Sequence, residues 1–211
     1  MGVPGEATHF DDDEDVRSNY LPMIEDLMLS EVPGSQKVVV FDFTIRKASS
    51  TKVVNRQVNK IHIDQSPKGA FHRARRHLSE ADAESVARGD CRLRIINAWK
   101  PIGGTVLDHP LVFADRRSVR HEDLVPVEQV YPDYVGETYV LKYRKGQEFW
   151  YWSKMRTTDV LLLQCFDSQN QTEANNSLDQ VQCAHGSFEL DDSGNEPCNR
   201  SSIAVRCLVL G

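Results

Sequence analysis

Residues 91–115 read CRLRIINAWKPIGGTVLDHPLVFAD and contain two short apolar runs separated by proline and glycine. The runs 91–100 and 109–115 are rich in aliphatic and aromatic residues, as is typical of strands. Further strand candidates follow with no helical stretch between them, at 137–144, 148–153, 159–168, 184–190 and 201–210. Short strands in succession without alternating helices predict a mainly antiparallel sandwich or barrel rather than a doubly wound sheet.

The N-terminal part of the chain supplies flanking helices and two more strands. Residues 16–31 place apolar side chains at helical spacing and predict an amphipathic helix. Residues 66–90 form the one long helical stretch, with a break expected near Ser79, where Ser-Glu-Ala-Asp resembles a capping box. The segments 37–44 and 52–64 are predicted strands, and the polar residues 168–180 are predicted to form a mobile loop.

The length of 211 residues suits one domain, which we expect to span 16–211 after a disordered acidic arm at 1–15. A net charge of -6 argues against nucleic acid or an anionic membrane surface as a partner. No apolar run approaches membrane-spanning length, and the acidic N-terminus resembles neither a signal nor a transit peptide, so a cytoplasmic location is expected. The five cysteines are odd in number and lack a C-x-x-C pair, which disfavours a disulfide framework and structural zinc.

His62 and Asp64 form an H-x-D triplet, and His185 lies on a short predicted strand far downstream. Two imidazoles and one carboxylate are the donor set of the facial triad that holds non-haem Fe(II) and leaves three positions open. Each histidine alone has a plainer interpretation, as a buried residue satisfied by its neighbours. The three residues in this order, on predicted strands, favour an iron site at His62, Asp64 and His185.

Arg200 and Ser202 open the last predicted strand. An arginine at this place can bind the distal carboxylate of 2-oxoglutarate through a bidentate, charge-assisted pair. Ser202 lies on the same strand face as Arg200 and can add a hydroxyl donor. Arg206 is in phase with both residues and is the second choice for the carboxylate anchor.

Two aromatic segments are candidates for the wall of a substrate pocket. Asn97 and Trp99 share one strand face, so that Asn97 could bond 2-oxoglutarate and Trp99 could line the pocket. Core filling is an equally good interpretation of Trp99. The run FWYW (149–152) should direct alternate side chains inward, which makes Trp150 and Tyr151 candidates for substrate contact; a core and surface role is the alternative.

A resemblance to a known family is carried by the segments HIDQSPKGAFHRARRHL, LRIINAWKPIGGTVLDHPLVFADRRSV, DLVPVEQVYPDYVGETYVLKY, WYWSKM, DVLLLQCFDS and RSSIAVRCLVL. Together they resemble the fungal and bacterial hydroxylase/desaturase family that includes gibberellin desaturase and the cephamycin methoxylation component. The resemblance spans residues 18–210 and implies a double-stranded β-helix, a jelly-roll barrel of the cupin type. It also implies that His62, Asp64 and His185 bind Fe(II) and that Arg200 binds 2-oxoglutarate.

The residues and the resemblance together predict an Fe(II)/2-oxoglutarate-dependent dioxygenase. Its expected reaction is the hydroxylation or desaturation, with O2, of an apolar small molecule in secondary-metabolite biosynthesis. A non-redox isomerase or cyclase on the same barrel, and a non-catalytic relic, are the alternatives; an intact triad counts against the relic.

Three departures from the family pattern stand out. Members of the family carry an additional N-terminal region, so an open site, a homodimer or changed chemistry is expected here. Gly186 stands where the family tends to have a hydroxyl residue, and Gln164 stands where a lysine is common.

Overall fold

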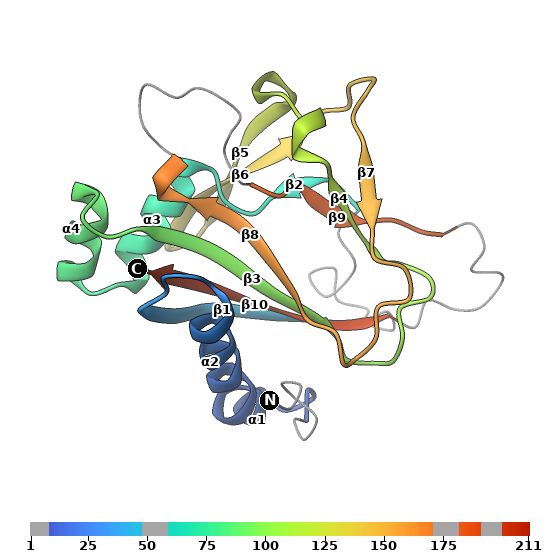
Figure 1. Cartoon of the computed structure of the whole chain (residues 1–211), viewed down its shortest axis with the longest axis horizontal. Coiled ribbons are helices and arrows are strands. Elements are labelled where there is room, and N and C mark those ends of the chain that lie inside the picture. Colours follow the sequence, from blue (N-terminus) through green and yellow to red (C-terminus); the bar gives the residue numbers. More distant parts are fainter. Residues whose placement is uncertain (1–8, 48–58, 171–181, 191–199) are drawn as a thin grey trace.

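The computed structural model describes residues 9–47, 59–170, 182–190 and 200–211, which form two antiparallel β-sheets with helices on the outside (Figure 1). The first sheet has the order β1 (Lys37–Lys47), β10 (Ser201–Leu210), β3 (Leu93–Pro101) and β8 (Leu161–Asp167). The second has the order β5 (Leu124–Tyr131), β6 (Tyr134–Leu141), β2 (His62–Ile63), β9 (His185–Ser187), β4 (Leu111–Ala114) and β7 (Phe149–Tyr151). The predicted fold class, mainly β with flanking helices, is confirmed.

The helices lie outside the two sheets. They are α1 (Asp13–Asp15), the π-helical turn η1 (Val16–Tyr20), α2 (Leu21–Glu31), α3 (Pro67–His77) and α4 (Glu80–Arg88). Short 3-10 turns are η3 (Arg116–Ser118), η4 (His121–Asp123) and η5 (Ser168–Asn170). No helix in the described part of the chain is long and apolar enough to cross a membrane.

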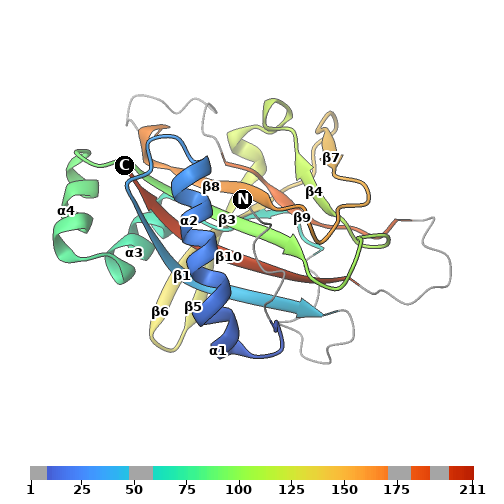
Figure 2. The ribbon, with the colours of Figure 1, turned by 60° about the horizontal axis from the view of Figure 1, so that its bottom comes forward.

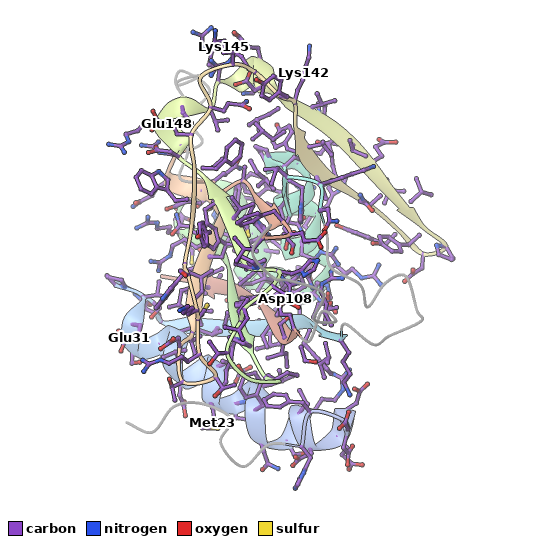
Figure 3. All side chains as sticks on the ribbon, turned by 90° about the vertical axis from the view of Figure 1, so that its right-hand side faces the viewer. Met23, Glu31, Asp108, Lys142, Lys145 and Glu148 are labelled. Atoms are coloured by element: carbon purple, nitrogen blue, oxygen red, sulfur yellow. The ribbon has the colours of Figure 1, made fainter. Side chains whose placement is uncertain are left out.

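Helix α2 covers the outer face of the first sheet, where it crosses β1 and β10 (Figure 2). Its buried residues Ile24 and Met28 belong to one apolar cluster with Val205 and Cys207 of β10. Successive side chains of a strand point to opposite faces, so the residues between them point away from α2. Arg206 is therefore directed away from α2, toward the side on which it lines a cavity. Figure 3 shows the described side chains on the ribbon.

The packing of α2 can be tested at Ile24, which is fully buried. We expect Ile24→Ala to lower the free energy of unfolding by about 2–5 kcal/mol, because it leaves a cavity between α2 and the sheet. Leu29 on the same helix is 44% exposed, and Leu29→Ala should change stability by less than about 0.5 kcal/mol. Urea denaturation of both variants measures the difference, and equal effects would contradict this packing.

Helix α3 begins directly after the H-x-D triplet and is anchored to β6. The side chain of Ser66 caps α3 by accepting a hydrogen bond from the Gly69 backbone N–H, and it donates to Glu137 Oε1 at 2.6 Å. The backbone N–H of Ser66 donates to the Glu137 carbonyl at 3.0 Å. These bonds fix the chain two residues after Asp64. The predicted break at Ser79 is confirmed, since Ser79 caps α4.

Three N-terminal and sheet-edge segments differ from what the sequence predicts. Strand β5 was not predicted, because Pro126 and exposed polar residues obscure its alternation at the sheet edge. Within the described part of 52–64, only His62–Ile63 forms a strand; residues 52–58 lie outside the described residues. Part of the N-terminal segment that was expected to be disordered is ordered. Asp13–Asp15 form helix α1, and the ring of Phe10 packs on Tyr20 with centroids 5.2 Å apart.

Residues 1–8 of the expected arm lie outside the described residues, as do residues 171–180 of the predicted loop. That 16–211 is a single domain stays a prediction.

Candidate metal and cofactor site

The two predicted histidine ligands lie side by side on adjacent strands. His62 of β2 is directly opposite His185 of β9 in the antiparallel pairing, and their ring centroids are 4.6 Å apart. Each Nδ1 donates to a backbone carbonyl, His62 to Lys60 at 2.8 Å and His185 to Cys183 at 3.0 Å. In the neutral form of each ring this leaves the lone pair on Nε2, which is the form of histidine that binds a metal.

Asp64 completes the group from the loop after β2. Its Oδ1 lies 3.1 Å from His62 Nε2 and 4.0 Å from His185 Nε2. One candidate ligand atom from each of the three residues lies within 4.8 Å of the others. Two imidazole nitrogens and one carboxylate oxygen, converging beside a cavity, fit Fe(II) with open positions.

The pKa shifts of the three residues follow from their burial and from their contacts with one another. Burial lowers the pKa of His185 to about 4, so that this imidazole is neutral at neutral pH. Burial also lowers the pKa of His62, but the hydrogen bond and charge of Asp64 outweigh it and raise that pKa. Burial raises the pKa of Asp64, but the Arg206 charge and the His62 hydrogen bond hold it well below its usual value. Asp64 is thus an ionised ligand.

A cavity of about 500 Å³, including its open mouth, lies against these ligands. Its other polar wall residues are Arg46, Asn97, Ser187, Arg200 and Arg206, and its apolar wall residues are Trp99, Leu111, Leu163 and Ala204. The cavity therefore combines cationic and amide groups with an apolar side.

Arg200 is 4% exposed and reaches the cavity from the residue before β10. Its Nη1 donates to the His109 carbonyl and, at 3.0 Å, to Ser187 Oγ. Ser187 was not predicted, although it lies two residues after His185 and hence on the same strand face. Ser202 is buried but does not line the cavity, and its Oγ has no hydrogen-bond partner among the described residues. Ser187, rather than Ser202, is the hydroxyl beside Arg200.

The predicted substrate residues fall into two groups. Trp99 is 6% exposed and lines the cavity, as predicted, with the Arg200 guanidinium 5.7 Å from its ring. Trp150 and Tyr151 do not line the cavity. The expected inward alternation of residues 149–152 is wrong, since all four side chains are 42–62% exposed. The reason is that, among the described strands, β7 is the last of its sheet and pairs with β4 alone.

The two positions that depart from the family pattern differ in their relation to the site. Gln164 of β8 does not line the cavity, and its Nε2 donates to Asp167 at 3.3 Å. Gly186 of β9 lines the cavity, and a Cβ added there would lie 2.9 Å from Ile61 Cδ1 and 3.1 Å from the Lys60 carbonyl oxygen. The same carbonyl orients His62. A side chain at Gly186 would therefore push on the segment that positions a ligand.

We expect Gly186→Ala to lower the free energy of unfolding by about 1–3 kcal/mol through overpacking and also to weaken metal binding. Gly136→Ala is the matched control, because its Cβ would be equally tight against the Tyr134 ring, at 2.9 Å, away from the cavity. Denaturation and calorimetric titration with Co(II) separate the two effects. Metal affinity that is reduced equally in both variants, or in neither, would contradict this role of Gly186.

The fold and the site together define a class of protein. Two antiparallel sheets of a double-stranded β-helix present a 2-His-1-carboxylate group to a cavity with a buried arginine on its wall. This combination is that of the non-haem iron oxygenases.

Comparisons with known proteins agree with this class. The family model described as an oxidoreductase/YMDC permease-like domain matches residues 2–210. The α-ketoglutarate-dependent dioxygenase tstK of Talaromyces stipitatus is 30% identical, over 95% of this chain and 72% of its own length. The hydroxylase/desaturase poxK of Penicillium oxalicum is 26% identical, over 93% of this chain and 66% of its own length.

A solved structure extends the agreement to three dimensions. The iron and α-ketoglutarate-dependent endoperoxidase NvfI matches 95% of this chain and 72% of its own chain, with 27% identity and a TM-score of 0.81. The chain belongs to the family of fungal hydroxylase/desaturases and Fe(II)/2-oxoglutarate-dependent dioxygenases. Its class is that of enzymes that use Fe(II), 2-oxoglutarate and O2 on a small-molecule substrate.

Proposed function

We propose that this protein is an Fe(II)/2-oxoglutarate-dependent oxygenase that hydroxylates or desaturates an apolar small molecule in secondary metabolism. The observation that carries the proposal is the in-register pairing of His62 with His185, with Asp64 Oδ1 facing both Nε2 atoms at the cavity wall. When bound, Fe(II) would activate O2, which is the oxidant; the oxidation of 2-oxoglutarate to succinate and CO2 would supply two electrons, and the substrate C–H bond would supply the other two.

In this proposal His62, Asp64 and His185 hold the iron, and Arg200 holds the distal carboxylate of 2-oxoglutarate. Arg200 is supported in this role by its burial and by its bonds to the His109 carbonyl and to Ser187, which restrict its guanidinium. Arg200 and the three triad residues line the same cavity, so a co-substrate bound there could contact both the iron and Arg200.

Trp99, Leu111, Leu163 and Ala204 give the cavity an apolar side, which supports an apolar substrate. These side chains would orient the substrate and exclude water from the reacting C–H bond. The relatives are named as dioxygenases, hydroxylase/desaturases and an endoperoxidase. Residues beyond the triad therefore set the outcome, by how they place the substrate.

An anaerobic titration tests the proposal. Fe(II) and then 2-oxoglutarate are added to metal-free protein, and a weak visible charge-transfer band of the chelate is expected. The band should be absent in His185→Ala. A protein that binds neither Fe(II) nor 2-oxoglutarate, and instead turns over a substrate without O2, would support the isomerase or cyclase alternative; one that binds neither and turns over nothing would support the relic. The homodimer and the cytoplasmic location stay predictions.

A further inference from the structure

The two oxygens of Asp64 have different surroundings. Oδ1 faces the two histidine Nε2 atoms, whereas Oδ2 accepts hydrogen bonds from Asn97 Nδ2 at 2.7 Å and from Arg206 Nε at 3.1 Å. We propose that Asn97 and Arg206 are positioning residues that hold Asp64 as a one-oxygen metal ligand, rather than residues that bind 2-oxoglutarate. The inference rests on the proposed function, since it concerns the same iron site.

Arg206 is engaged from two sides. Besides its bond to Asp64, its Nη1 donates to Asp42 Oδ2 at 2.8 Å and to Thr44 Oγ1 at 3.0 Å, both on β1. Its side chain is 18% exposed. The guanidinium thus bridges β1 to Asp64 and restrains the carboxylate through Oδ2. Metal ligands are commonly oriented by hydrogen bonds of this kind from residues that do not touch the metal.

Asn97 is oriented by the same carboxylate oxygen. Its Nδ2 must face Asp64 Oδ2, because the flipped amide would place two acceptors together. Its Oδ1 is buried and has no hydrogen-bond partner among the described residues. An acceptor of this kind repels a carboxylate and accepts from a water or hydroxyl group. Asn97 is therefore poorly suited to bond 2-oxoglutarate, and well suited to position Asp64.

The consequence concerns how many metal positions stay open. A carboxylate that binds through both oxygens takes an additional position, which 2-oxoglutarate and O2 require. Two donors on Oδ2 oppose that mode, because chelation would break both hydrogen bonds. The hydrogen bonds from Asn97 and Arg206 also keep Oδ1 directed at the Nε2 atoms of the two histidines.

Titration of the metal-free protein with Co(II) alone, in the absence of 2-oxoglutarate, tests the inference. We expect Asn97→Ala and Arg206→Gln to weaken Co(II) binding by about 10- to 100-fold. The visible bands of bound Co(II), which report coordination number and geometry, should change as well. Arg200→Gln is the matched control: it replaces a buried arginine of the same cavity and should leave Co(II) affinity and spectrum as in the wild type.

The opposite assignment gives a different result. If Asn97→Ala and Arg206→Gln bind Co(II) as the wild type does but lose 2-oxoglutarate binding, the inference is overturned and both are co-substrate ligands. If Arg206→Gln does not fold, which circular dichroism shows, Asn97→Ala carries the test alone, because it removes an uncharged group. A wild-type protein that binds no Co(II) overturns the proposed function itself, a failure distinct from unchanged affinity in the variants.

Discussion

Asp64→Ala is expected to abolish metal binding and to destabilise the protein as well. The change removes a metal ligand and leaves the buried guanidinium of Arg206 with Asp42 as its only carboxylate contact among the described residues. Removing one partner of a buried ion pair costs about 3–5 kcal/mol, and the lower end applies here because Asp42 remains. Urea denaturation of the metal-free protein should show this loss.

The stabilisation by bound Co(II) separates the loss of metal binding in Asp64→Ala from its loss of stability. Co(II) at about 100 times its Kd should stabilise the wild type by about 2.7 kcal/mol and the variant not at all. Asp133→Ala is the control, since Asp133 pairs with Arg76 on the surface and is 70% exposed. That variant should change stability by less than about 1 kcal/mol and keep the full response to Co(II). A normal Co(II) response in Asp64→Ala would show that Asp64 is not a ligand.

Arg200→Met is expected to weaken the binding of 2-oxoglutarate strongly while Fe(II) binding persists. A buried, charge-assisted pair contributes about 2–5 kcal/mol, so the affinity for 2-oxoglutarate should fall by about 30- to 5,000-fold. Calorimetric titration of the Fe(II)-loaded protein under anaerobic conditions measures the fall. The unbranched methionine side chain keeps most of the buried volume, which limits the effect on folding.

The control for Arg200→Met is Arg156→Ala, because Arg156 is 69% exposed and pairs only with Asp159 among the described residues. It should bind 2-oxoglutarate as the wild type does. Unchanged 2-oxoglutarate affinity in Arg200→Met would move the anchor to another cation of the cavity, and Arg206 would then regain the role that the sequence suggested as second choice.

The position of each cation could not be derived from strand periodicity. Arg200, directly before β10, is in phase with Ser202 and Arg206 of that strand, so alternation treats the three alike. The structure separates them through their partners on other strands: Ser187 of β9 beside Arg200, and Asp42 of β1 beside Arg206. Ser202 lies outside the cavity lining. Which partner meets which residue depends on long-range register.

The sequence by itself determined the fold class and the donor set. Apolar runs with a period of two, divided by proline and glycine, specify strands through local sterics and burial, and the helical spacing in 16–31 specifies the helix that covers them. The H-x-D triplet and His185 are visible as residue types in order along the chain. Side-chain chemistry of this kind is local information, and it sufficed to single out His62, Asp64 and His185, which the structure brings together.

Only the tertiary structure decided how these groups meet. The register of β2 against β9 brings His62 opposite His185, and the approach of β10 and β3 gives Asp64 Oδ2 its two donors. The edge position of β7 leaves Trp150 and Tyr151 outside the cavity. These outcomes depend on the register between strands that are far apart in sequence. That register is set by the burial of whole strand faces, which a local sequence pattern does not reveal.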